Sequence, residues 1–135
     1  MIDYKNLIID EDQLRNLYLD NKWFAYTNDF ENLIKGIKNS TDVIGAYDGE
    51  LLVGLIRTIS DQATVCHIQD ILILDSHKHQ GIGTKLLTMI FDKYINVRQV
   101  ILITDINDPR SNNFYKKLGM VEYKDRNCIG YQVKK

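Results

Sequence analysis

A glycine-containing segment at the start of a helical pattern is the part of the chain best suited to chemistry. It follows a long aliphatic stretch and reads Lys78-His79-Gln80-Gly81-Ile82-Gly83-Thr84. The start of a helix presents backbone N–H groups without acceptors and carries roughly half a unit of positive charge. Glycine at positions 81 and 83 lets this backbone approach an anion without an intervening Cβ atom. The segment therefore predicts a diphosphate cradle, and a plain strand-to-helix turn is the alternative.

Two familiar nucleotide-binding motifs do not fit this segment. A Walker A loop requires a second glycine followed by lysine and then serine or threonine, and this combination is absent. A dinucleotide-binding fingerprint requires a third glycine, and Leu86 occupies that position. Any diphosphate bound here belongs to another class of ligand.

Two ionisable residues interrupt the apolar strand pattern that precedes the glycines. Side chains alternate between the two faces of a strand. The alternation predicts one face with Cys66, Ile68, Asp70 and Leu72, and the other with His67, Gln69, Ile71 and Ile73. A carboxylate among aliphatic residues requires a partner, solvent or a function, and histidine ordinarily titrates near neutrality. Asp70 and His67 are therefore candidate proton acceptors; polar residues at a wet edge, or a water chain in their place, are the alternatives.

The elements that position these residues form a mixed α/β pattern in the order β-α-α-β-β-β-α-β-α-β-β. Asp10 with Gln13 and Asn28 with Glu31 are capping-box pairs that start the first two helices. Asp108-Pro109 starts the last helix, and Gly119 ends it. The predicted strands are 6–9, 43–47, 51–59, 64–74, 99–104, 121–124 and 128–133, and the third helix covers 82–94. This order predicts a mixed sheet with helices on both faces.

Two motifs at a characteristic separation resemble the GNAT acetyltransferase superfamily. The first is the family pattern Gln/Arg-x-x-Gly-x-Gly/Ala, which stands here as Lys78-His79-Gln80-Gly81-Ile82-Gly83 with lysine in the first position. The second resembles the family's FYxxxGF signature and reads Phe114-Tyr115-Lys116-Lys117-Leu118-Gly119-Met120. The resemblance follows the element order of the whole chain and is strongest over residues 64–120.

The resemblance implies the GNAT fold, an α/β (α+β) architecture. Its mixed, mostly antiparallel sheet has about six or seven strands that splay apart between the fourth and fifth, with about four helices on both faces. It also implies that acetyl-coenzyme A enters this gap, with its pantetheine arm against the backbone of Leu72, Ile73 and Leu74 and its diphosphate on residues 78–84. A backbone N–H of this strand would polarise the thioester carbonyl.

The same resemblance assigns two further residues. Tyr115 is implied as the acid that protonates the leaving thiolate and as a cofactor contact. The family's asparagine six residues before the phenylalanine falls on Asp108, so the cofactor contact is assigned to the adjacent Asn107.

Aromatic residues concentrate between the first two helices, where an acceptor would bind. Trp23, Tyr26 and Phe30 are the predicted substrate contacts, since such rings suit an apolar or cationic amine. Plain packing of two helices is the alternative. The chain is thus predicted to be an N-acetyltransferase for a small-molecule primary amine; a non-catalytic acyl-CoA sensor, or an unrelated interaction domain, remains the competing reading.

Composition limits the other classes of function. The 135 residues suit a single domain, 1–135, and 17 basic against 18 acidic residues argue against a nucleic-acid partner. No apolar run approaches the roughly twenty residues of a membrane helix. The two cysteines form no metal-binding motif and fit a reducing cytoplasm. The resemblance also makes a homodimer an expectation.

Overall fold

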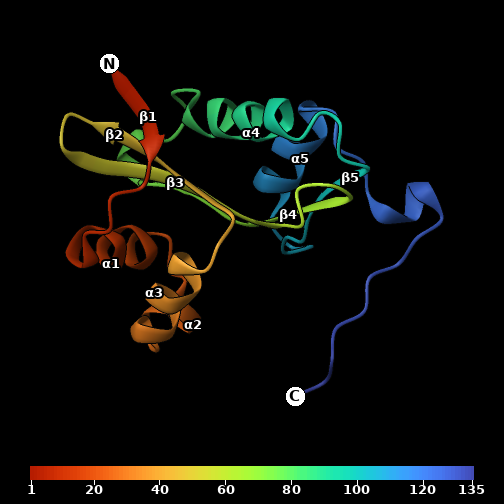
Figure 1. The fold of residues 1–135 in the computed structure, drawn as a ribbon, viewed down its shortest axis with the longest axis horizontal. Helices are drawn as coiled ribbons and strands as arrows, with labels where there is room; N and C mark the ends of the chain where they lie inside the picture. The colour runs from red at the N-terminus through yellow and green to blue at the C-terminus, as the bar shows by residue number, and fades with distance from the viewer. The chain divides into compact units, whose positions relative to one another are not determined.

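The computed structural model describes all 135 residues, which form two compact units, residues 1–103 and residues 104–135. The first unit contains the whole sheet, whose strands follow one another in chain order (Figure 1). The first four strands are antiparallel, and the fifth runs parallel to the fourth. The strands are β1 (Ile2–Asn6), β2 (Asp42–Asp48), β3 (Leu51–Ser60), β4 (Val65–Ile73) and β5 (Gln99–Leu102).

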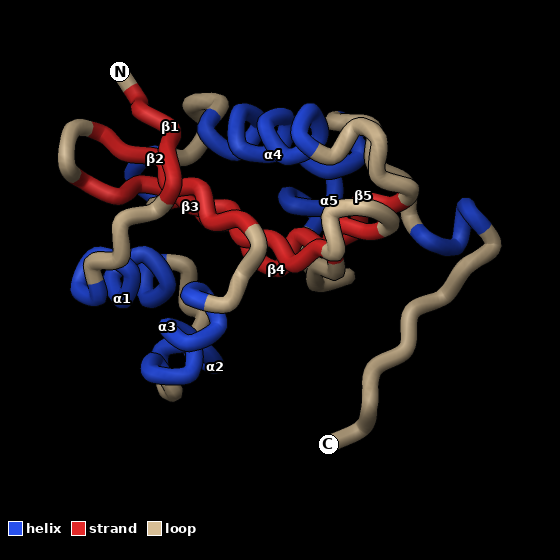
Figure 2. Tube along the Cα trace, viewed as in Figure 1, coloured by secondary structure: helices blue, strands red, loops and turns tan.

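Helices cover both faces of this sheet (Figure 2), as predicted. Three of them lie on one face and α4 on the other (Figure 1). The helices of the first unit are α1 (Glu11–Asp20), α2 (Phe24–Thr27), α3 (Phe30–Lys38) and α4 (Ile82–Lys93). The second unit has α5 (Pro109–Lys117), and short 3₁₀ turns cover Asp75–His77 and Tyr123–Arg126. Apolar side chains on one stripe of each long helix of the first unit form the core: Leu14, Leu17, Phe30, Leu33, Ile34, Ile37, Ile82, Leu86, Leu87 and Ile90.

Side-chain caps mark the starts of α1 and α5, whereas α3 begins after Asp29 without one, so the predicted capping box of Asn28 with Glu31 is wrong. The Asp10 carboxylate accepts a hydrogen bond from the Gln13 amide, as predicted, but the Gln13 side chain bonds Glu50 and Leu52 instead of closing the box. Asp108 caps α5 by accepting from the Ser111 amide, with proline next in the chain.

The predicted gap between the fourth and fifth strands is present. β5 pairs only with Val65–Ile68, so β4 continues beyond its partner from Gln69 to Ile73. A strand edge without a partner presents backbone N–H and C=O groups that another extended chain can pair with. This open stretch of β4 ends at Ile73, and four residues separate it from the glycine-containing segment that begins at Lys78.

A bulge at the start of the open stretch changes the predicted faces of β4. Arg57 of β3 pairs with Asp70, whereas the next residue, Thr58, pairs with Ile68, so β4 has one extra residue there. Directly opposed residues share a face, which places Ile68 on the α4 face and Asp70 on the face of α1–α3. The prediction that Cys66, Ile68, Asp70 and Leu72 share one face is therefore wrong: the bulge separates the first two from the last two.

The strand count is five, below the predicted six or seven. Residues 121–124 and 128–133 contain no strand; the first range enters the 3₁₀ turn, and the second has no regular structure. The first strand ends at Asn6, where the sequence pattern had it begin, and α2 was not predicted. These short segments lack the sustained periodicity on which such predictions depend.

Close contact between α4 and the sheet depends on Gly54. A Cβ atom there would lie 2.9 Å from Ile73 Cδ1 and 3.2 Å from Ile82 Cγ2. We expect Gly54→Ala to lower the free energy of unfolding by about 1–3 kcal/mol because the packed core must shift. Gly130→Ala, whose Cβ would meet nothing within 4 Å, should stay within about 0.5 kcal/mol of wild type in the same urea titration. Equal stability of the two variants would contradict this packing argument.

Candidate functional site

The open stretch of β4 directs unpaired backbone amides away from β3. The Leu74 amide donates to the Val53 carbonyl at 2.8 Å and so points toward β3. Because successive amides of a strand alternate in direction, those of Ile73 and Ile71 point to the open edge. The Asn21 side chain donates to the Ile73 carbonyl at 3.0 Å, so this carbonyl already has a partner. The open edge can therefore donate hydrogen bonds to an extended ligand.

The start of α4 adds a second group of free amides. Gly81 has φ of 80°, a left-handed conformation that favours glycine. The first bond into the helix runs from the Lys85 amide to the Gly81 carbonyl at 3.0 Å. The amides of Ile82, Gly83 and Thr84 have no acceptor within the chain. This is the donor arrangement that an anionic group requires.

Two carboxylates fix the turn that leads to these amides. Asp20 of α1 accepts from the Asp75 amide at 2.7 Å, and Asp48 at the end of β2 lies 2.9 Å from His77 Nε2. Lys78 lies 3.6 Å from the Asp75 carboxylate. His79 follows with φ of 64°, so the backbone turns sharply just before Gln80. The turn is held at its beginning and exposes its last residues.

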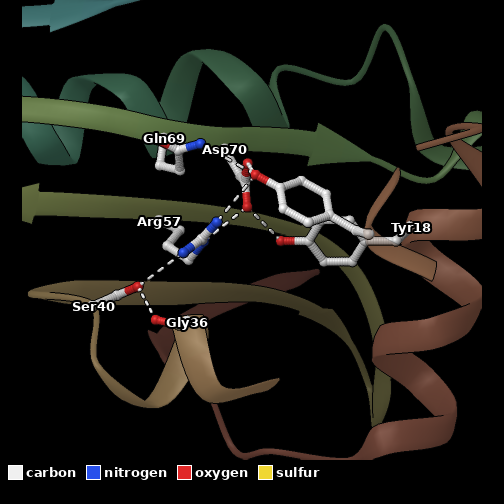
Figure 3. Close-up of polar contacts among 7 residues, drawn as sticks. Tyr18, Gly36, Ser40, Arg57, Gln69 and Asp70 are labelled. Atoms are coloured by element: carbon white, nitrogen blue, oxygen red, sulfur yellow. Dashed lines mark hydrogen bonds and ion pairs between the residues drawn. The ribbon is translucent and has the colours of Figure 1, made fainter. Parts of the chain in front are cut away.

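A buried ion pair between Arg57 and Asp70 lies at the bulge, on the face of the sheet that packs against α1–α3 (Figure 3). Asp70 is 3% exposed and Arg57 is 5% exposed. Asp70 Oδ2 accepts from Arg57 Nε at 2.7 Å and from the Tyr18 hydroxyl at 2.8 Å. Asp70 Oδ1 accepts from the Tyr26 hydroxyl at 2.9 Å. Three donors thus compensate the burial of one carboxylate.

The same network reaches the surface through Tyr26 and Gln69. The Tyr26 oxygen accepts from Arg57 Nη2 and from the exposed Gln69 Nε2, each at 3.2 Å. On its other side the guanidinium donates to Ser40 Oγ at 3.3 Å, and Ser40 donates to the Gly36 carbonyl at 2.8 Å. We call the group Tyr18, Tyr26, Arg57, Gln69 and Asp70 the bulge network.

The surroundings of Tyr18, Tyr26 and Arg57 raise the pKa of all three side chains. Burial, reinforced by the Asp70 charge, raises the pKa of Tyr18. Burial is also the largest cause of the raised pKa of Tyr26. Burial alone would lower the pKa of Arg57, but the Asp70 charge outweighs it and the net direction is upward. Both hydroxyls therefore remain donors to the carboxylate at neutral pH.

The predicted proton acceptors lie in different surroundings. All three hydrogen bonds to Asp70 come from the protein, and its side chain is 2% exposed. His67 pairs with Ile101 of β5 and so lies in the closed part of the sheet, before the open stretch begins. Neither placement presents a free basic group at the open edge.

The three predicted substrate contacts differ in how far solvent reaches them. Trp23 and Tyr26 are half-buried, with ring centroids 6.1 Å apart, and Tyr18 lies beneath both. Phe30 is buried on α3 with the Arg15 guanidinium over its ring, so it packs in the helical layer. Trp23 and Tyr26 remain as the accessible aromatic pair.

Sequence reasoning missed Arg57 and Tyr18. One signal was available: Arg57 is the only charge within the apolar stretch 51–59, and Asp70 is the only charge within 68–74. Opposite charges isolated in consecutive predicted strands indicate a buried pair. The contribution of Tyr18 could not be read this way, because its helix position looks like ordinary core.

In the second unit, Tyr115 lies on α5. Burial, followed by the nearby Asp108 charge, raises the pKa of Tyr115 to about 12, so its hydroxyl stays protonated at neutral pH. The Phe114 and Tyr115 rings are 5.5 Å apart. Asn107 is exposed; its backbone N–H donates to the Asp105 carboxylate at 2.8 Å, and its side chain makes no hydrogen bond within the chain.

The structure has no cluster of three or more His, Cys, Asp or Glu side chains that could hold a metal ion. Both cysteines are free, Cys66 buried and Cys128 exposed. None of the helices combines the length and apolar character needed to span a bilayer.

Comparison with known proteins gives one consistent family. The profile of the acetyltransferase (GNAT) family matches residues 10–120. An acetyltransferase of the GNAT family from Streptococcus pneumoniae TIGR4 is 28% identical, with a TM-score of 0.86 over 100% of this chain and 98% of that one. A probable acetyltransferase from methicillin-resistant Staphylococcus aureus is 24% identical, with a TM-score of 0.79 over 100% of both chains, and supports the fold. An uncharacterized N-acetyltransferase from Gracilaria tenuistipitata var. liui is 33% identical over 72 residues, which are 53% of this chain and 39% of that protein.

The buried ion pair leads to a stability prediction that distinguishes the loss of Arg57 alone from the loss of both charged residues. Arg57→Met leaves the Asp70 charge buried without its cation, and we expect a loss of about 3–5 kcal/mol in the free energy of unfolding. The double variant Arg57→Met, Asp70→Leu buries no charge and should be more stable than Arg57→Met alone. Urea unfolding of the two proteins measures the difference, and a double variant less stable than the single one would refute the argument.

Proposed function

Because the chain belongs to the acetyltransferase (GNAT) family, an acyltransferase family that uses acetyl-coenzyme A, we propose that it acetylates the primary amine of a small molecule. The observation that carries this proposal is the joint placement of two donor groups in one unit. The open edge of β4 leads directly into the turn whose last residues begin α4. The family match spans 10–120 and so crosses both units, which supports one catalytic domain over 1–135.

The residues present fit the coenzyme. The free amides of Ile82, Gly83 and Thr84 would hold the diphosphate, with Gly81 supplying the left-handed turn and the backbone of Lys78, His79 and Gln80 forming the rest of the cradle. The pantetheine arm would pair with the outward amides of Ile71 and Ile73 on the open edge of β4, with Leu72 and Leu74, the other predicted contacts, beside them. Bound there, acetyl-coenzyme A supplies an activated acetyl thioester. Asn107 is proposed as a further contact through its unbonded side chain.

Backbone amides of the open edge would stabilise the negative charge that develops on the thioester carbonyl oxygen. We assign this role to the amide of Ile71 or Ile73, which points away from β3. An amide fixed in this direction stabilises negative charge developing on a carbonyl oxygen by roughly 3–4 kcal/mol. The new C–N bond forms as the C–S bond breaks, and the proton lost by nitrogen leaves through solvent.

Tyr115 is proposed to serve the leaving sulfur. Its pKa of about 12 lies above the value of about 8.5 for a thiol, so complete transfer of its proton is uphill. We therefore propose that the Tyr115 hydroxyl donates a hydrogen bond to the developing thiolate and keeps its proton, while solvent protonates the released thiolate. Of the two other predicted catalytic residues, His67 would act from the closed part of the sheet, because its strand segment is paired with β5.

Trp23 and Tyr26 are the proposed acceptor contacts, since both residues are half-buried neighbours and the Tyr26 hydroxyl lies 3.2 Å from Gln69 Nε2. Phe30 would contribute only through its packing in the helical layer, where Arg15 covers its ring. The two free cysteines support a reducing compartment such as the cytoplasm, and a homodimer is carried over as a proposal from the family resemblance.

Two measurements on the wild-type protein test the function. Titration calorimetry should show saturable binding of coenzyme A, and a panel of primary amines should release free thiol from acetyl-coenzyme A. Binding without turnover for any amine would contradict acetyl transfer and favour an acyl-CoA sensor. Absence of binding would contradict the donor site itself.

Gly83→Val tests the diphosphate cradle. The branched side chain adds bulk at the second residue of α4, where bare backbone is proposed to face the anion. We expect coenzyme A binding to fall below detection in calorimetry while circular dichroism is unchanged. Gly130→Val is the matched control, because its added atoms lie in open space and binding should be unaffected. Retained affinity in Gly83→Val would place the diphosphate elsewhere.

Tyr115→Phe tests the leaving-group role. Loss of the hydroxyl should lower kcat roughly a hundredfold with little change in coenzyme A affinity, since the contact matters most as sulfur gains charge. Tyr123→Phe removes a hydroxyl from the same unit and should keep wild-type kcat. If Tyr115→Phe is as active as this control, Tyr115 has no part in the chemistry.

A further inference from the structure

The Asp70 carboxylate is fully used inside the protein. Its two oxygens accept three hydrogen bonds, from Arg57, Tyr18 and Tyr26, at 2.7 to 2.9 Å. The side chain is 2% exposed, so a substrate cannot reach it without breaking the bulge network. Asp70 can therefore influence a ligand only by orienting the residues that donate hydrogen bonds to it.

The group that it holds toward solvent is the Tyr26 hydroxyl. A phenol has one proton, and that of Tyr26 is directed to Asp70 Oδ1 at 2.9 Å. The Tyr26 oxygen can then only accept hydrogen bonds, as it does from Arg57 Nη2 and Gln69 Nε2. Asp70 thereby fixes the half-buried Tyr26 hydroxyl as an acceptor.

Gln69 completes the surface of the network. It is exposed, and its amide nitrogen is held by one bond of 3.2 Å to Tyr26. Since Tyr26 can only accept there, Gln69 must turn its nitrogen inward, which leaves its amide oxygen Oε1 for a ligand. A ligand N–H can also displace the long Gln69–Tyr26 bond. Two oxygen acceptors therefore lie next to each other at the first residue of the open stretch.

We propose that the acceptor amine binds through its N–H groups to Tyr26 Oη and Gln69 Oε1, with its apolar body against the Trp23 ring. The inference rests on the proposed function. Asp70, Arg57 and Tyr18 are positioning residues that hold the Tyr26 oxygen as an acceptor, which the amine N–H reaches by displacing Gln69 Nε2. The substrate class is a primary monoamine with an apolar body, because Trp23 offers an aromatic surface and Arg57 already neutralises the one carboxylate of the bulge network.

The location suits transfer. Gln69 begins the open stretch of β4, and the outward amide of Ile71 follows two residues later. An amine held at Gln69 is therefore beside the backbone proposed to bind the thioester carbonyl. Nitrogen keeps its lone pair for the carbonyl carbon when its protons are the atoms bound by Tyr26 and Gln69.

Binding can be followed without turnover because Trp23 is the only tryptophan. We expect 2-phenylethylamine, titrated into the protein saturated with coenzyme A, to change Trp23 fluorescence with saturation. Tyr26→Phe should weaken this binding roughly tenfold, as one lost hydrogen bond allows. Coenzyme A affinity should be unchanged. Tyr131→Phe, at an exposed position of the second unit, is the matched control and should bind both ligands normally.

A double-mutant cycle separates positioning from direct contact. Asp70→Asn should weaken 2-phenylethylamine binding in the wild-type background and have no further effect in Tyr26→Phe. An equal loss in both backgrounds would show that Asp70 acts independently of Tyr26 and would overturn its assigned role. If circular dichroism shows that Asp70→Asn does not fold, the cycle of Tyr26→Phe with Gln69→Ala decides instead. Non-additive losses support the paired amine contact, and unchanged affinity in either single variant overturns it.

Failure of this inference and failure of the proposed function give different results. Wild type that binds 2-phenylethylamine but acetylates no amine contradicts only the function. Wild type that acetylates other amines but neither binds nor acetylates 2-phenylethylamine contradicts the substrate class. Turnover that is unaffected in Tyr26→Phe, in both kcat and the KM for amine, contradicts the contact while leaving the enzyme assignment intact.

Discussion

The buried pairing of Arg57 with Asp70 is the constraint on which the rest of the site depends. Removing either charge from water costs several kcal/mol, so the pair is tolerated only where hydrogen bonds surround it. The carboxylate has Arg57, Tyr18 and Tyr26, and the guanidinium also has Ser40. Both charged residues lie opposite each other at the bulge. Their pairing therefore ties the irregularity of β4 to helices α1 and α2 and to the segment that follows α3.

The bulge has two consequences for β4. It turns Asp70 and Leu72 toward α1–α3, while Ile71 and Ile73 join the apolar layer under α4. The bulge also lies where the pairing between β4 and β5 ends, so it sets the direction in which β4 continues beyond β5. An unpaired strand edge is ordinarily a liability for association. Here the same edge is short and supplies the amides that a bound thioester would use.

Rigidity on both sides of the open edge favours a preorganised site. Asp20 and Asp48 hold the turn that leads to α4, and Gly54 lets this helix lie close on the sheet. The bulge network fixes the other side at Tyr26 and Gln69. Donor and acceptor groups arranged in advance stabilise a transition state without reorganisation during the reaction. The two sides meet on one strand, so the proposed thioester and amine contacts would lie within one small unit.

The sequence by itself determined the elements with sustained periodicity and strong local signals. It gave the long strands, α1, α4 and α5, the caps at Asp10 and Asp108, and the glycines before α4, since each depends on neighbouring residues. Two motifs were enough to indicate the family. Isolated charges in consecutive strands could also have indicated the pairing of Arg57 with Asp70.

Only the tertiary structure decided the role of Asp70. A one-residue bulge reverses which side chains share a face, and no local pattern signals it because pairing with β3 creates it. The same holds for Tyr18 and Tyr26, which reach Asp70 from 52 and 44 residues away. Local sequence sets what each segment can form. Contacts between distant segments decide whether a buried carboxylate is a free base or a fixed partner.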